Sequence, residues 1–223
     1  MWHLPPGLPR ATTAAAREDR RAQILTCARE EFAKSGYHAT KIDDIVAAAK
    51  IARGTFYLYF SDKRAIFEEL VDRFFARLGM SIQRVDTDDP TRTVEEQIRE
   101  NMRRVLGVFL EDRTMTKIFV ADAIGVDPAF DAKLMSFYDE VGKLFIESLS
   151  DGQKLGIVKR GDVRLYAYFT MVGIKEVLFH LVRRHWEYEV EELEEAFFAI
   201  IRGGYLEEKV AGKGKAPARK KRR

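Results

Sequence analysis

The sequence predicts an all-α protein of about nine helices. Three observations support this: apolar residues recur at helical spacing almost throughout, no segment shows a convincing strand pattern, and helix breakers are few and well placed. The 223 residues suit one large or two small domains. With 46% hydrophobic and 33% charged residues, the chain is expected to be globular and not disordered as a whole.

Each expected helix is marked by an apolar stripe or an end signal. In chain order the stripes are Ile24, Leu25, Ala28 and Phe32; Ile66, Leu70, Phe74 and Leu78; Ile98, Met102, Val105 and Phe109; and Leu134, Phe137, Val141, Leu144 and Phe145. Gly36 follows the first stripe, where a left-handed cap is expected. Pro128 suits a first helical turn, and Asp162 suits the N-cap of a long apolar helix. The last two helices are expected over residues 163–184 and 190–207.

Charge is distributed unevenly along the chain. The net formal charge is +4 over residues 1–64, −9 over residues 65–208 and +8 over residues 209–223. A basic face binds polyanions through counterion release, whereas an acidic body resists lying along DNA. We therefore expect the first segment to contact nucleic acid and the acidic body to sense a ligand or bind a partner.

Residues 40–63, TKIDDIVAAAKIARGTFYLYFSDK, are the most informative stretch. Thr40 is placed to cap a helix that begins at Lys41, with Asp43 as the reciprocal capping carboxylate. After a short break at residues 50–52, a second short helix is expected over residues 53–60. Two short helices joined by such a turn form a helix-turn-helix, whose second helix fits the DNA major groove.

The second of these helices has the composition of a reader of DNA. Its large or hydrogen-bonding side chains are Arg53, Thr55, Tyr57, Leu58 and Tyr59. Phe56 and Phe60 lie four residues apart and can anchor it to a core. Gly54 costs about 1 kcal/mol relative to alanine inside a helix, which suits a backbone that must approach a phosphate or groove wall closely.

Residues 24–36, 40–49 and 53–63 resemble the TetR family of one-component transcriptional regulators, most specifically in the spacing G-T-x-Y-x-Y-F-x-x-K from Gly54 to Lys63. The resemblance implies a homodimer whose recognition helices enter successive major grooves of a palindromic operator. By position it implies groove contacts from Arg53, Thr55, Tyr57 and Leu58, and phosphate contacts from Thr40, Tyr59 and Lys63. The chemistry agrees, since arginine can pair with guanine and threonine or leucine can meet a thymine methyl.

Two positions depart from the family pattern. The family commonly has glycine where Lys50 stands and serine where Ala52 stands. Lys50 is therefore expected to adopt a strained turn at a cost of about 1 kcal/mol, and it could contact a phosphate. Ala52 gives up a side-chain cap of similar value.

The body is expected to bind an apolar effector, because aromatic and methionine side chains can line an adaptable cavity among helices. Each of these residues, taken singly, is more often simple core. The candidate ligand-binding residues are Met102, Arg103, Phe109, Phe119, Tyr138, Phe145, Phe169, Phe179 and His180. By resemblance, the last two helices of each subunit form the dimer interface; the alternative is that they only close the monomer core.

Other classes of function find less support. Cys27 is the single cysteine, so no internal disulfide is possible and a reducing cytoplasm is expected. His180 and His185 lack a metal-binding arrangement, and neither a cofactor, a metal nor an enzymatic activity is expected. The most apolar stretch, residues 165–174, is about half the length that crosses a bilayer.

The sequence thus predicts a repressor, released when a hydrophobic effector changes the separation of the two recognition helices through the helix that starts at Lys63. Its expected parts are a disordered arm over 1–17, a DNA-binding domain over 18–64, an effector-binding and dimerisation domain over 65–208, and a disordered basic tail over 209–223, which could add nonspecific DNA affinity. The alternative is a ligand-independent architectural or adaptor DNA-binding protein whose helical body binds a protein partner.

Overall fold

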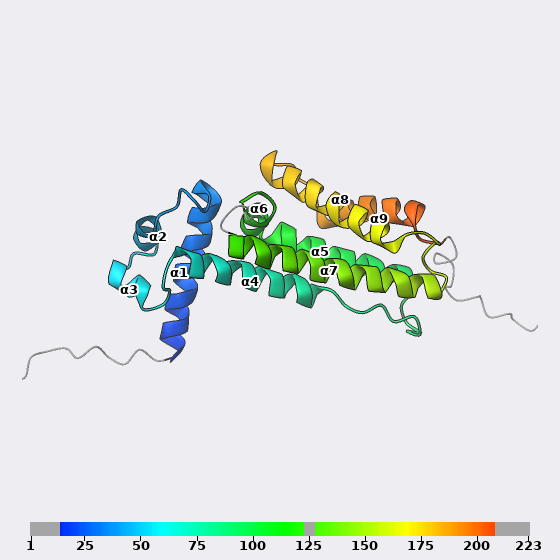
Figure 1. Cartoon of the computed structure of the whole chain (residues 1–223), viewed down its shortest axis with the longest axis horizontal. Helices are drawn as coiled ribbons and strands as arrows, with labels where there is room; N and C mark the ends of the chain where they lie inside the picture. The colour runs from blue at the N-terminus through cyan, green and yellow to red at the C-terminus, as the bar shows by residue number, and fades with distance from the viewer. Residues whose placement is uncertain (1–13, 123–127, 208–223) are drawn as a thin grey trace, which may run out of the picture. The chain divides into compact units, whose positions relative to one another are not determined.

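The computed structural model describes residues 14–122 and 128–207, and in these ranges the chain is helical, as predicted (Figure 1). Its α-helices are α1 (Ala14–Ser35), α2 (Ile42–Ala48), α3 (Arg53–Tyr57), α4 (Lys63–Ser81), α5 (Val94–Glu111), α6 (Arg113–Lys117), α7 (Pro128–Lys154), α8 (Val163–Arg183) and α9 (Val190–Gly204). A π-helical turn, η1 (Ile118–Asp122), follows α6. Extended pairing within the described residues is limited to one isolated bridge between Val158 and Leu206.

The chain forms two compact units, Met1–Asp72 and Arg73–Arg223, so the division falls inside α4 and not after residue 64. The first half of α4 belongs to the first unit because its side chains complete that unit's core. The Phe67 ring packs edge-on against Phe32 of α1, with centroids 5.3 Å apart, and lies 4.7 Å from the ring of Tyr37. α4 therefore runs continuously from one unit into the other.

The helix α1 starts earlier than expected. Residues 14–17, assigned from sequence to a disordered arm, form its first turn. Three of these residues are alanines, and alanine has the highest helix propensity of all amino acids. The rest of the expected arm and all of the expected basic tail lie outside the described residues. At its other end α1 stops as predicted, with Gly36 at φ +80° and its N–H donating to the Phe32 carbonyl over 2.8 Å.

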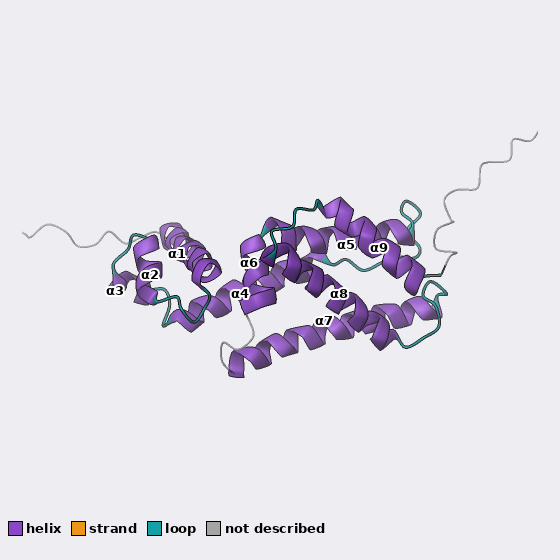
Figure 2. Cartoon of the chain, turned by 90° about the horizontal axis from the view of Figure 1, so that it is seen from above, coloured by secondary structure: helices purple, strands orange, loops and turns teal. Residues whose placement is uncertain are grey.

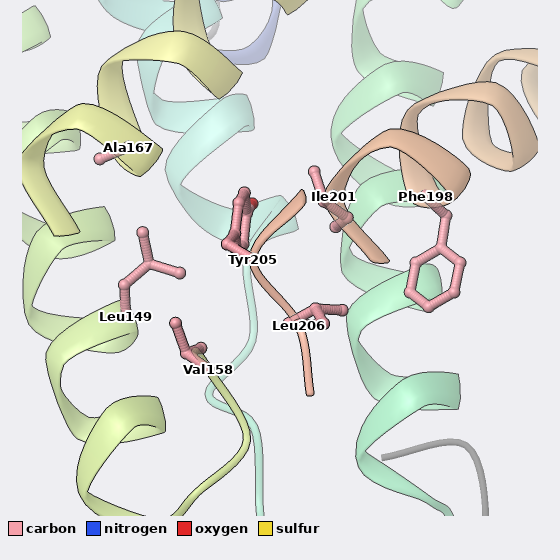
Figure 3. Packing of buried hydrophobic residues seen from close by; sticks show 7 residues of the cluster. All are labelled: Leu149, Val158, Ala167, Phe198, Ile201, Tyr205 and Leu206. Atoms are coloured by element: carbon pink, nitrogen blue, oxygen red, sulfur yellow. The ribbon is translucent and has the colours of Figure 1, made fainter. Parts of the chain in front are cut away.

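The second unit is a helical body in which α5 packs along α9, and α7 packs against α8 (Figure 2). One end of its core is a cluster of buried side chains from α7, α8, α9 and the segments that follow α7 and α9 (Figure 3): Leu149, Val158, Ala167, Phe198, Ile201, Tyr205 and Leu206. Asp162 caps α8 as predicted, its side chain accepting from the Arg164 N–H. Pro128 opens α7, also as predicted.

The apolar surfaces of α8 and α9 divide into a covered part and an uncovered part. Leu181 of α8 and Leu193, Phe197 and Ile201 of α9 are buried within the chain. A separate face of α8 is left uncovered, formed by Leu165, Tyr168, Phe169 and Val172, with between 50% and 76% of each residue exposed. This set, called the α8 face below, recurs every three or four residues along α8. On α9, Ile200 is also exposed, at 69%.

Among the described residues α8 is also long and apolar enough to cross a membrane by length and composition alone. This corrects the expectation that the most apolar segment is too short, because the run extends to Arg183. Only 17% of its most apolar window is buried within the chain. A single helix of this kind is weak evidence for a membrane span, since an apolar helix covered by a partner subunit passes the same test.

Candidate nucleic-acid interface

The start of α2 differs from the sequence prediction. Lys41 is the N-cap residue, and its backbone N–H donates to the Asp44 carboxylate over 2.8 Å, so Asp44 and not Asp43 is the capping acid. Thr40 is buried at 1% exposure, and its hydroxyl lies 2.8 Å from the Gly36 carbonyl. The Thr40 side chain thus fixes the turn between α1 and α2 instead of capping α2 or presenting its hydroxyl to a phosphate.

The turn between α2 and α3 has the strained geometry predicted for it. Lys50 has φ +52°, one of two non-glycine residues with positive φ in the described chain, and its side chain is exposed. Ala52 occupies the N-cap of α3 without a side-chain hydrogen bond, as expected. The strain at Lys50 and the missing cap at Ala52 are both losses of stability that the fold tolerates at this turn.

The side chains of α3 separate into an anchored side and an open side. Phe56 and Phe60 are buried at 0% and 3% exposure, with ring centroids 5.9 Å apart, which confirms them as the anchors of this segment. The helix itself ends at Tyr57, and a turn carries the chain on through Leu58. Four of the predicted DNA-facing residues are exposed, namely Arg53, Gly54, Tyr57 and Leu58, while Thr55 and Tyr59 are half-buried.

Within residues 14–122 and 128–207, nothing requires a glycine at position 54. A Cβ built there meets no atom within 4 Å, and the backbone has no positive φ. The glycine therefore leaves the outer surface of α3 bare, so that another molecule could approach its backbone closely.

Lys63, predicted to contact a phosphate, is engaged within the protein. Its ammonium donates to the carbonyls of Tyr37, His38 and Thr40 over 2.6, 3.3 and 2.9 Å, and it lies 4.3 Å from the centre of the Tyr37 ring. Burial lowers the pKa of Lys63. The first residue of α4 thus holds the α1–α2 turn in place.

Sequence reasoning missed a second clamp, centred on Arg21 of α1. Its guanidinium pairs with Glu69 of α4, donates to the Tyr59 carbonyl over 2.8 Å and lies 4.4 Å from the centre of the Phe60 ring. Arg21 therefore ties α1, the end of the α3 segment and α4 together. The partners are 38 and 48 residues away in sequence, so no local spacing marks this contact.

The predicted ligand-binding residues do not gather in one place. Phe109, Phe119 and Tyr138 share an aromatic cluster, in which the Phe119 ring lies 6.1 Å from Phe109 and 5.6 Å from Tyr138. Phe74 and Phe75 of α4 also contact Phe119. Among the described residues the Tyr138 hydroxyl has no hydrogen-bond partner although it is buried, and burial raises the pKa of Tyr138 to about 12.

The remaining members of that set lie elsewhere. Met102 and Phe145 pack against the core cluster of Figure 3, and Arg103 pairs with the buried Glu194. Phe179 and His180 lie near the end of α8, where the His180 ring stacks on Trp186. Phe169 is 76% exposed on the α8 face. These positions follow from helix rotation and packing, which composition does not specify.

The described surface has an open hollow in each unit, and neither of these is lined by the aromatic cluster. One, of about 350 Å³, is lined in the second unit by residues of α5 together with Ser81 and Val190. The other, of about 390 Å³, lies in the first unit beside Leu58 and Tyr59. Within residues 14–122 and 128–207 no group of three or more histidine, cysteine or acidic side chains is placed to hold a metal ion.

Comparison with known proteins relates the first unit to a described protein family. A sequence model described as "Bacterial regulatory proteins, tetR family" matches residues 24–70. The fatty acid metabolism regulator protein of Bacillus subtilis strain 168 is 24% identical, over 82% of this chain and 93% of its own length. The matched residues 24–70 comprise the later part of α1, all of α2 and α3, and the start of α4.

Solved structures extend the likeness to the body. A TetR-family transcriptional regulator from Syntrophomonas wolfei is 28% identical with a TM-score of 0.65, covering 82% of this chain and 93% of that one. Bacillus subtilis FadR, solved in complex with stearoyl-CoA, shares the fold at 24% identity and a TM-score of 0.65, over 81% and 96% of the two chains.

The exposed α3 and these relatives together define a helix-turn-helix, DNA-binding transcriptional regulator. Through residues 24–70 the chain is similar to the TetR family of bacterial regulatory proteins, and a solved TetR-family structure shares its fold over most of the chain.

Proposed function

We propose that the chain is a cytoplasmic, non-enzymatic repressor that reads a palindromic operator as a homodimer and is released by an apolar small molecule. The observation that carries the proposal is the outer surface of the α3 segment, where Tyr57 and Leu58 are 46% and 72% exposed beside Arg53 and the bare backbone of Gly54. Exposed leucine and tyrosine side chains suit contacts with thymine methyl groups and groove walls. Lys50 and Tyr59 remain candidates for phosphate contacts.

The reader is tested by selecting duplexes from a random DNA pool with the purified full-length protein and its Tyr57→Ala variant. We expect the wild type to enrich one palindrome and the variant to lose it, because truncation of an exposed side chain leaves the fold intact. A Met80→Ala variant, which truncates a side chain 75% exposed in the second unit, serves as the control and should keep the palindrome. Enrichment unchanged by Tyr57→Ala would remove α3 as the reader.

The α8 face supports the proposed dimer. It gathers four large apolar side chains that the described residues leave uncovered, which is unusual on the surface of a monomer. A two-fold interface uses the same patch on both subunits, as reading a palindrome requires. Phe169→Asp should therefore give a folded monomer in analytical ultracentrifugation. Leu155→Asp, at a side chain 59% exposed beyond the end of α7, should remain a dimer. A dimeric Phe169→Asp variant would place the interface elsewhere.

The aromatic cluster supports an apolar ligand that carries one hydrogen-bonding group. Phe109, Phe119 and Tyr138 supply apolar rings, and the Tyr138 hydroxyl is a buried polar atom that finds no partner in the part of the chain that the structure describes. A ligand that displaces part of this packing would satisfy the hydroxyl. A long-chain acyl compound fits this chemistry, and one structural relative was solved with stearoyl-CoA.

Release is proposed to follow a shift between two conformations of α4. Two residues of α4 that contact Phe119, namely Phe74 and Phe75, belong to the same continuous helix as Lys63, which holds the α1–α2 turn. A ligand that binds beside Phe119 can therefore bias the position of α4. Stearoyl-CoA, titrated into the complex with the selected palindrome, should release the wild type at lower concentration than Tyr138→Phe. Binding without release would favour the ligand-independent adaptor.

A further inference from the structure

Asp43, at the start of α2, contacts the residue expected to read guanine. Its carboxylate forms an ion pair with one terminal nitrogen of Arg53, Nη1, across the turn between α2 and α3. The other terminal nitrogen, Nη2, lies 3.4 Å from the Tyr57 hydroxyl, and the guanidinium carbon lies 6.0 Å from the centre of the Tyr57 ring. Arg53 is therefore held between an acidic side chain of α2 and the next turn of its own segment.

Capping does not explain Asp43, because the neighbouring Asp44 already accepts the N–H of Lys41. Stability does not explain it either. The Arg53 and Asp43 side chains are 56% and 65% exposed, and ion pairs at such exposure contribute little to folding. A carboxylate on a surface that approaches DNA is, moreover, repelled by phosphates. Its placement beside Arg53 therefore calls for another role.

Base reading supplies that role. A free arginine side chain samples many rotamers, whereas recognition of guanine needs two of its N–H groups aligned in one plane with the O6 and N7 acceptors. A carboxylate bound to one side of the guanidinium fixes that plane while the remaining donors stay available. Because Asp43 and Arg53 come from different helices, the ion pair also fixes the direction of the Arg53 side chain relative to α2.

We propose that Asp43 is a specificity-determining positioning residue, which orients Arg53 so that it selects guanine at one position of each half-site. The inference rests on the proposed function, in which α3 enters the major groove. Asp43 acts through Arg53 and not on the DNA itself. Its loss therefore changes which base is preferred at a single position more than it changes the overall affinity.

The test compares base preferences from random-pool selection for the full-length wild type, Arg53→Ala, Asp43→Asn and Asp43→Glu. A bidentate arginine–guanine contact discriminates against other bases by roughly 10-fold to 100-fold. We expect Arg53→Ala to remove the preference at one position and Asp43→Asn to reduce it at that same position to about 3-fold or less. Asp43→Glu, which keeps the carboxylate, should retain most of the preference.

Glu30→Gln is the matched control, since it removes one exposed negative charge from the same unit at a site on α1. Both charge-removing variants should bind all DNA somewhat more tightly at low salt, but only Asp43→Asn should change a base preference. A preference profile for Asp43→Asn equal to that of Glu30→Gln would overturn the proposal. So would a change confined to a position that Arg53→Ala leaves intact, because Asp43 would then read a base itself. If Arg53→Ala changes no position at all, Arg53 reads no base and the proposal fails, whereas the assignment of α3 as reader fails only if Tyr57→Ala also keeps the palindrome.

Discussion

Replacing Gly54 by alanine should stabilise the protein while weakening its binding to DNA. The added Cβ meets no atom within 4 Å and the backbone needs no positive φ, so the folded state accepts it without strain. Glycine in a helix costs roughly 0.5–1 kcal/mol relative to alanine, and because α3 is short we expect the gain at the lower end, about 0.5 kcal/mol. For a chain of this size that corresponds to a rise in Tm of roughly 1–2 °C.

The same methyl group stands where the backbone of α3 is proposed to approach the groove. We expect affinity for the selected palindrome to fall by about tenfold or more, which corresponds to about 1.4 kcal/mol. Gly107→Ala is the matched control, since an added Cβ at this helical glycine of α5 also meets no atom within 4 Å. It should raise Tm without changing DNA affinity. Equal DNA affinity of the Gly54→Ala variant and the wild type, with Tm raised, would refute the close-approach argument.

Three further predictions concern the second unit. Glu194→Ala should destabilise the protein by about 2 kcal/mol in urea unfolding, because Arg99 and Arg103, whose side chains are 29% and 40% exposed, lose their buried partner. Glu195→Ala, at an exposed residue next to it, should cost little. Tyr138→Phe should leave the free energy of unfolding within about 0.5 kcal/mol of wild type, since no hydrogen bond is lost, and should abolish the tyrosine ionisation near pH 12 in an ultraviolet titration. Hydrogen bonds from the side chain and backbone of Thr91 hold the pKa of Asp89 at about 2. The stabilising contribution of Asp89 is therefore complete above pH 3.8 and is lost as the pH falls toward 2. A carboxyl pKa near 4 by NMR would contradict this.

The fold and the anchored side of α3 could be predicted because they follow from local rules. The spacing of apolar residues correctly predicted the buried stripe of α1, and Gly36 correctly predicted where the helix ends. Phe56 and Phe60, four residues apart, were correctly predicted to face the core. Asp162 at the start of α8 was likewise recognised from its residue type and its place before an apolar run.

Contacts between distant segments could not be predicted in the same way. The three carbonyls that Lys63 binds are brought together by the turn at Gly36. Because the sequence alone does not show this turn closing around Lys63, a phosphate was the only partner that could be predicted for it. The pairing of Arg21 with Glu69 depends on how α1 crosses α4. A sequence signal did exist for Asp43, since two adjacent aspartates stand at a helix start where one capping acid suffices.

The aromatic residues of the body show a further limit. Composition identified Phe109, Phe119 and Tyr138 as candidates for one site, and these do contact one another in the structure. The same reasoning included Phe169, which lies exposed on the α8 face. Side-chain type does not report which way a helix is rotated when most of its faces are apolar, as they are on α8.

The central claim is that two copies of the α3 surface, joined through the α8 face, read one palindrome. The most direct test measures the affinity of the wild type and of Phe169→Asp for the selected palindrome and for a duplex with only one half-site. We predict that the wild type prefers the palindrome by at least 100-fold, because the second reader binds at high effective concentration, and that Phe169→Asp binds both duplexes equally weakly. Equal affinity of the wild type for the two duplexes would contradict the account.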